Sequence, residues 1–152
     1  MQRRINFFDK VTQRIINRLM RQTRWNMTEA INRAIEVGGN IFDMANEHAP
    51  YDGLVVLDER FRQRYLDAVT LRDLLAFFSN WRHQVAYNTT SRTEEIIAAY
   101  KRAEELNSDT TIRQLVRTGA NAIMAAGKAR SFTLIVLLPN GNDHRETITM
   151  HF

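Results

Sequence analysis

The chain has no cysteine, and only two prolines and six glycines among its 152 residues. Without cysteine it has no disulfide framework, no thiolate zinc or iron–sulfur site and no cysteine nucleophile. The scarcity of proline and glycine leaves no low-complexity linker. Apolar runs stop at about five residues, as in 134–138, far short of the roughly 18 needed to span a bilayer. With no apolar signal segment either, we expect one domain, 1–152, in the cytoplasm or a virion and not secreted.

Lysine is also scarce, because the 21 basic residues are 18 arginines and three lysines. The first 33 residues hold eight basic side chains and two acids, whereas residues 34–78 hold four basic and eight acidic ones. Arginine presents a planar fork of donors that grips phosphate or carboxylate at two points. A basic front and an acidic middle therefore predict two electrically different faces, suited to binding a polyanion or copies of the same chain.

Residues 1–24 are predicted to form a basic amphipathic helix. Apolar side chains recur at spacings of three and four, which is one stripe of a helix. These are Ile5, Phe8, Val11, Ile15 and Leu19. Helical projection places the basic side chains on the opposite side. We expect Arg14, Arg18 and Arg21 to be exposed, with Ile15 and Leu19 buried.

Capping signals predict further helices along the chain. The expected caps are Asn26, Asp58, Thr70, Ser91 and Asp109. The helix after Thr70 carries the most apolar residues and is expected at the centre of the core, and the last helix is expected to end at Gly127. Small residues at Ala30, Ala34 and Gly38 would let another helix approach closely. The pair Gly38-Gly39 predicts a kink or a restart of the helix.

The hydrophobic period changes from 3.6 to 2 at the C-terminus. Residues 132–138 and 146–152 are predicted strands joined by the turn 139–143, which gives a β-hairpin within 131–152. Two strands alone are marginally stable, so a helix, residues 54–57 as a third strand, or another copy must cover the apolar face. The side chains assigned to contacts between copies are Phe132, Leu134, Val136, Ile148, Met150 and Phe152. The expected fold class is therefore mainly α, in the all-alpha class: a single domain of about five to six helices with a C-terminal β-hairpin.

No pattern in the sequence points to catalysis or to a bound cofactor. The histidines at 48, 83, 144 and 151 share no metal-ligand spacing. The segment 127–131 lacks the residues of a phosphate-binding loop, and no nucleophile elbow is present. We therefore predict no catalytic residue, no metal, no cofactor and no small-molecule substrate.

The arginine-rich surface predicts a non-enzymatic, oligomeric nucleic-acid-binding protein, with DNA and RNA both open. A viral or phage packaging, structural or replication accessory protein would fit such a chain. The candidate contacts are Arg3, Arg4, Lys10, Arg14, Arg18, Arg21, Arg24, Arg113, Arg117, Lys128 and Arg130. The arginines at 60, 62 and 64, beside Phe61 and Tyr65, are weaker candidates because neighbouring acids dilute them. The alternatives are an adaptor whose basic helix docks on an acidic partner or on its own acidic middle segment, and a helix lying on an anionic membrane.

Overall fold

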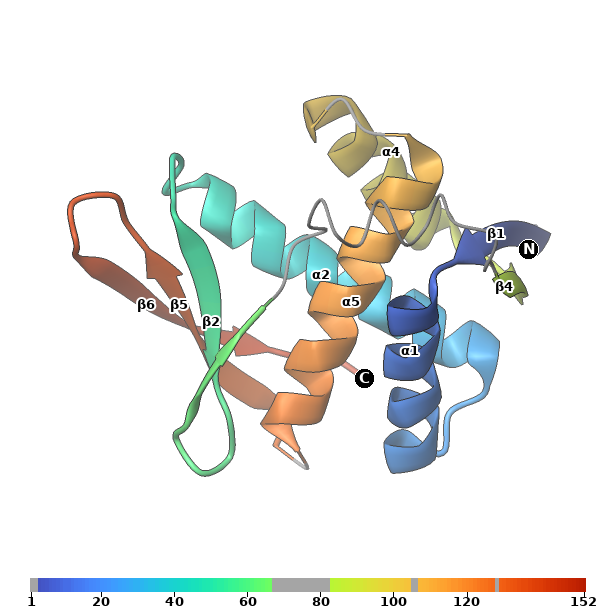
Figure 1. Ribbon diagram of the computed structural model, residues 1–152, viewed down its shortest axis with the longest axis horizontal. Coiled ribbons are helices and arrows are strands. Elements are labelled where there is room, and N and C mark those ends of the chain that lie inside the picture. Colours follow the sequence, from blue (N-terminus) through green and yellow to red (C-terminus); the bar gives the residue numbers. More distant parts are fainter. Residues whose placement is uncertain (1–2, 67–82, 105–106, 128) are drawn as a thin grey trace.

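The computed structural model describes residues 3–66, 83–104, 107–127 and 129–152, which contain four helices and six strands (Figure 1). The helices are α1 (Lys10–Thr23), α2 (Met27–Asn46), α4 (Ser91–Glu104) and α5 (Ser108–Ala126). The strands are β1 (Arg3–Phe8), β2 (Gly53–Leu57), β3 (Gln63–Tyr65), β4 (His83–Asn88), β5 (Ser131–Leu137) and β6 (Asp143–Thr149). The fold is thus a mixture of α and β, and the predicted mainly α, all-helical class is wrong.

Helix α5 lies at the centre of the described structure, with α1 on one side and the larger sheet on the other (Figure 1). Its closest partner is α2, as the small residues of α2 predict. A methyl group on Gly119 would overlap the carbonyl oxygen of Ala34, and one on Gly38 would overlap that of Leu115. Helix α2 runs unbroken through Gly38-Gly39, so the predicted restart of the helix is wrong. These glycines serve the close crossing of two helices.

The larger sheet is antiparallel, with the strand order β3-β2-β5-β6. The predicted C-terminal hairpin is confirmed as β5 and β6, and residues 54–57 do supply a third strand. Strand β6 begins at Asp143, three residues earlier than predicted, because Leu138 N–H bonds to the Asn142 carbonyl and closes the turn at once. Leu54, Val56 and Ile148 are buried in the main core. The sheet is therefore covered by helices of its own chain.

The N-terminal residues form strand β1, which pairs antiparallel with β4, and α1 starts only after it. The helix predicted over 1–24 is therefore wrong over residues 3–9. The Asp9 carboxylate accepts the N–H of Thr12 at 2.7 Å, which fixes the helix start. Leu19 is buried as predicted, but Ile15 is only partly buried and Ile16 takes its place in the core, while Val11 is 37% exposed.

Some of the remaining predicted helix caps are present in the structure, and others are not. Asn26 caps α2 by accepting the Glu29 N–H at 2.8 Å, as predicted. Helices α4 and α5 are present, but their caps are Thr90 and Asn107, one and two residues before the predicted ones. No helix follows Asp58, where the structure has a turn and β3. The helix predicted after Thr70 falls largely on 67–82, outside the described residues, and its predicted end lies in strand β4.

Candidate functional site

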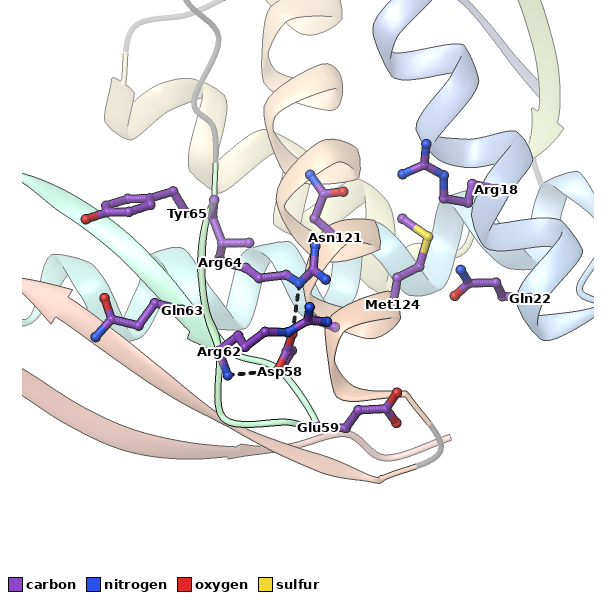
Figure 2. A pocket seen from close by; sticks show the side chains of 12 residues that line it. Arg18, Gln22, Asp58, Glu59, Arg62, Gln63, Arg64, Tyr65, Asn121 and Met124 are labelled. Atoms are coloured by element: carbon purple, nitrogen blue, oxygen red, sulfur yellow. Dashed lines mark hydrogen bonds and ion pairs between the residues drawn. The ribbon is translucent and has the colours of Figure 1, made fainter.

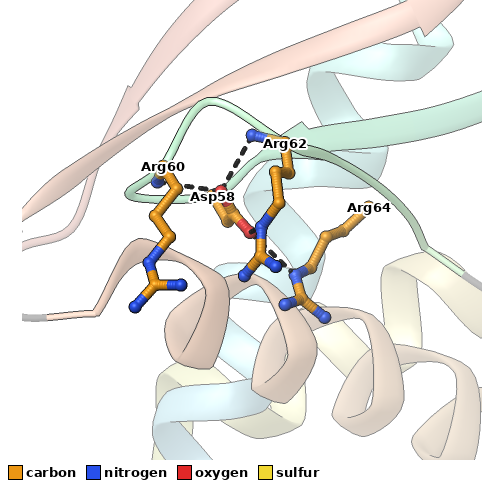
Figure 3. Close-up of polar contacts among 4 residues, drawn as sticks. All are labelled: Asp58, Arg60, Arg62 and Arg64. Carbon is orange, nitrogen blue, oxygen red and sulfur yellow. Dashed lines mark hydrogen bonds and ion pairs between the residues drawn. The ribbon is translucent and has the colours of Figure 1, made fainter.

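Asp58 organises the turn between β2 and β3 (Figure 3). One carboxylate oxygen accepts the backbone N–H groups of Arg60 and Arg62, each at 2.9 Å. The other accepts the Nε–H groups of Arg62 and Arg64, each at 3.0 Å. The Asp58 side chain is 4% exposed, whereas those of Arg62 and Arg64 are 58% and 55% exposed. A single buried carboxylate therefore holds two exposed guanidinium groups in fixed positions.

The environment of Asp58 keeps it ionised. Burial alone would raise its pKa, but the backbone N–H of Arg62, the guanidinium of Arg64, the N–H of Arg60 and the guanidinium of Arg62 outweigh that effect. The net result is a pKa well below the usual range for aspartate. Arg62 and Arg64 use only Nε for these bonds, so within the described residues their terminal Nη groups remain available to a ligand.

Arg62 and Arg64 line a hollow of about 570 Å³ between β3, α5 and α1 (Figure 2). Their guanidinium groups extend over α5, where Asn121 and Met124 form the floor. Arg18 projects from α1 on the opposite side. Arginines from two separate elements thus face a common space, which we name the arginine cleft: Arg18, Arg62 and Arg64 over the floor of Asn121 and Met124.

The exposed face of α1 extends the positive charge beyond the cleft. Lys10, Arg14, Arg18 and Arg21 are all exposed, as predicted, and the helix contains no acidic residue. None of these four forms an ion pair with another described residue. Arg24 is also exposed, and with Arg21 and Trp25 it lines a second hollow of about 400 Å³ at the end of α1.

The turn after β2 and strand β3 together present two chemically different faces. The side chains of Arg60, Arg62 and Arg64 extend on one side (Figure 3), whereas the ring of Tyr65, which also lines the hollow, points to the other side of β3 (Figure 2). This follows from the two-residue period of an extended chain. Tyr65 is 65% exposed and Phe61, within the turn, is 83% exposed. Large exposed aromatics beside a cationic face are unusual for a purely structural surface and suit contact with planar groups.

The structure separates the other predicted contact residues. Arg113 and Arg117 lie in α5 with 1% and 3% exposure, so they are not on the surface that the prediction requires. Arg130 is exposed and donates from Nη1 to the Phe152 carbonyl at 3.3 Å. The side chains of Arg3 and Arg4, and all of Lys128, lie outside the described residues. The α1 residues therefore remain candidate contacts with nucleic acid, whereas the burial of Arg113 and Arg117 argues against that role for them.

Five of the six apolar side chains assigned to contacts between copies are instead covered within the chain. These five, at most 6% exposed, are Phe132, Leu134, Val136, Ile148 and Met150. Phe152 is 40% exposed, and its ring lies 5.2 Å from that of Trp25 and 4.8 Å from the Arg33 guanidinium. The hairpin face is thus part of the core of the chain and is not free for a second copy.

Arg62 and Arg64 are more prominent in the structure than the sequence pattern predicts. The alternation of arginine with other residues from Arg60 to Tyr65 signals an extended segment with one cationic face.

Away from the cleft, the structure also brings His48 to His144 and Glu146, although the histidines share no ligand spacing. A hydrogen bond from His144 lowers the pKa of Glu146, against the raising effect of its partial burial. The sole sequence signal for this cluster is the separation of two between 144 and 146, which places both on one face of a strand.

Comparison with known proteins finds no matching family, no similar curated protein and no similar solved structure. Among the described residues, no helix combines the length and apolar character required to cross a membrane. The function must therefore be inferred from the arrangement of side chains in the cleft.

We expect Asp58→Asn to destabilise the protein at neutral pH by loosening the turn. Because the pKa of Asp58 is lower in the folded than in the unfolded state, its contribution is complete above about pH 4. It declines as the pH falls toward the folded-state pKa. Urea unfolding of wild type and Asp58→Asn should therefore differ most at pH 7 and least near pH 2. A carboxyl carbon of Asp58 that titrates near pH 4 in an NMR experiment would contradict this pairing.

Proposed function

We propose that this protein binds nucleic acid, with the sugar–phosphate backbone held in the arginine cleft and along the exposed face of α1. The observation that carries the proposal is the pair Arg62 and Arg64, fixed by buried Asp58 and facing Arg18 across the hollow. Fixed guanidinium groups lose little conformational freedom on binding, and each can grip a phosphate through two parallel N–H groups.

The charge around the cleft supports a phosphate polymer over a single small anion. The cleft arginines continue into Arg14 and Arg21 on α1, so cations extend along the surface well beyond one phosphate. Neutralising successive phosphates releases counterions, which drives the binding of polyanions. Phe61 and Tyr65 add exposed rings on which unpaired bases can stack, a feature that an acidic protein partner would not use.

The proposal is one of binding and not of catalysis. The described residues that line the hollow include no histidine, serine, threonine or lysine; its buried carboxylate, Asp58, is engaged by arginine, and the exposed Glu59 and Tyr65 are its other titratable groups besides the arginines. A packaging, structural or replication accessory role in a virus or phage is compatible with such a surface. The hairpin face has no part in the proposal, because helices of the same chain already cover it.

The proposal predicts steeply salt-dependent binding to oligonucleotides. If six cations of α1 and the cleft each neutralise one phosphate, log K should fall against log salt with a slope of about −4 on single strands and about −5 on duplex DNA. Fluorescence anisotropy with labelled 20-nucleotide probes between 50 and 200 mM salt measures this slope. Binding to polyglutamate with equal affinity would support the acidic-partner alternative, and no binding of either polymer at 50 mM salt would refute the proposal.

A further inference from the structure

A second cluster of chemically reactive side chains lies where the end of α2 meets the C-terminal hairpin. His48 follows the last turn of α2, and His144 and Glu146 stand on the same face of β6. All three side chains are partly buried. This cluster lies outside the arginine cleft and plays no part in the proposed function.

The three side chains converge on one small volume. Their potential ligand atoms all lie within 4.8 Å of one another. Glu146 Oε1 is 2.7 Å from His144 Nε2 and 3.7 Å from His48 Nε2. The two imidazole rings are 3.8 Å apart between centroids, with a tilt of 31°.

The Nε2 atom of His48 is buried and has no hydrogen-bond partner among the described residues. Buried polar atoms in native proteins nearly always have a partner, so an unsatisfied one calls for an explanation. The distance to Glu146 is too long for a hydrogen bond. It is, however, close to the separation of two ligands that share one metal ion.

We propose that His48, His144 and Glu146 form a binding site for a divalent transition metal of the zinc class. Ligands at about 2.0–2.1 Å in a tetrahedron stand about 3.3 Å apart, near the observed separation of His48 and Glu146. The shorter contact between His144 and Glu146 is a hydrogen bond of 2.7 Å, which would open by about 0.6 Å to hold the ion. Two imidazole nitrogens and one carboxylate oxygen suit zinc, whereas calcium and magnesium require oxygen ligands alone. Water fills the fourth position.

The bound ion would join two segments that are far apart in the sequence. It would fasten the end of α2 to an edge strand of the sheet, since among the described strands β6 pairs only with β5. Because the ligands converge only in the folded chain, zinc binds the folded state preferentially and stabilises it. At zinc concentrations 100-fold above Kd, this linkage raises the melting temperature by about 5–10 °C for a chain of this size.

Isothermal titration calorimetry with zinc chloride, on the full chain in a non-chelating buffer, tests the site. We expect one zinc ion per chain, no measurable binding of magnesium, and a loss of affinity of at least about 10-fold in each of His48→Ala, His144→Ala and Glu146→Gln. His151→Ala is the matched control, because this exposed histidine lies outside the cluster. It should bind zinc as the wild type does.

Thermal melting with and without zinc gives a second measurement. Glu146→Gln keeps the shape of the side chain, so it should retain the fold and lose the zinc-dependent rise in melting temperature. The proposal is overturned if the wild type binds no zinc, if all three ligand variants keep wild-type affinity, or if His151→Ala loses as much as they do.

Discussion

Reversing the charge of two residues on α1 is expected to weaken oligonucleotide binding by about 100-fold or more. The variant is Arg14→Glu/Arg18→Glu, in which both side chains are exposed and form no ion pair with a described residue. Hydrogen bonds to charged groups contribute about 1.5–3 kcal/mol each, so two lost contacts amount to at least 3 kcal/mol. The slope of log K against log salt should also flatten by about 1.4 on single strands and about 1.8 on duplex DNA. Anisotropy titrations at several salt concentrations measure both effects.

The matched control is Arg92→Glu/Arg102→Glu. It makes the same change in net charge at two exposed positions of α4, neither of which lines the arginine cleft. Any general effect of net charge should appear equally in both variants, whereas a localised interface should respond only to the α1 pair. Exposed substitutions away from caps usually alter stability by about 0.5 kcal/mol or less, so circular dichroism should show both variants folded. If the two variants bind with equal affinity, α1 is not part of the interface.

The sequence alone could locate the cationic face of α1 but not the strand that precedes it. The apolar residues Ile5 and Phe8 continue the spacing of the helix, so the local pattern favours one long helix. The decisive interaction is the pairing of β1 with β4, which lies some 80 residues along the chain. Phe8 is fully buried in that arrangement. A helical period in a short segment therefore cannot exclude a strand whose partner is distant.

The arginines illustrate why charge by itself does not place a residue at the surface. Arg113 and Arg117 were predicted to contact nucleic acid, a role that requires them to be exposed. Helix α5, however, contacts α2, α1 and strands of both sheets, so it has little surface to offer. Conversely, Arg62 and Arg64 were discounted because acids stand close by in the sequence. Asp58 in fact positions them, a role that depends on the turn and not on a sum of charges.

The close crossing of α2 and α5 depends on small residues in both helices, so it could be predicted from the sequence only in part. Small residues at Ala30, Ala34 and Gly38 correctly signalled that another helix approaches α2. What the sequence did not reveal is the contact position on the partner, because α5 holds several small residues and their spacing does not single out Gly119. The partner position is visible only when both helices are placed together.

Gly119→Ala is expected to cause a large loss of stability, although such a change usually favours a helix by about 0.5–1 kcal/mol. The added methyl group would overlap the carbonyl oxygen of Ala34 and press on the backbone nitrogen of Gly38. Backbone atoms of a packed helix cannot rotate out of the way as a side chain can. The two helices must therefore separate, which lowers the free energy of unfolding by about 3 kcal/mol or more. Urea unfolding followed by circular dichroism gives this difference in the free energy of unfolding. Gly53→Ala is the control, because its methyl group would meet only Leu137 Cδ1 at an ordinary 3.6 Å. A Gly119→Ala protein as stable as the Gly53→Ala protein would mean that α2 and α5 do not cross at this point.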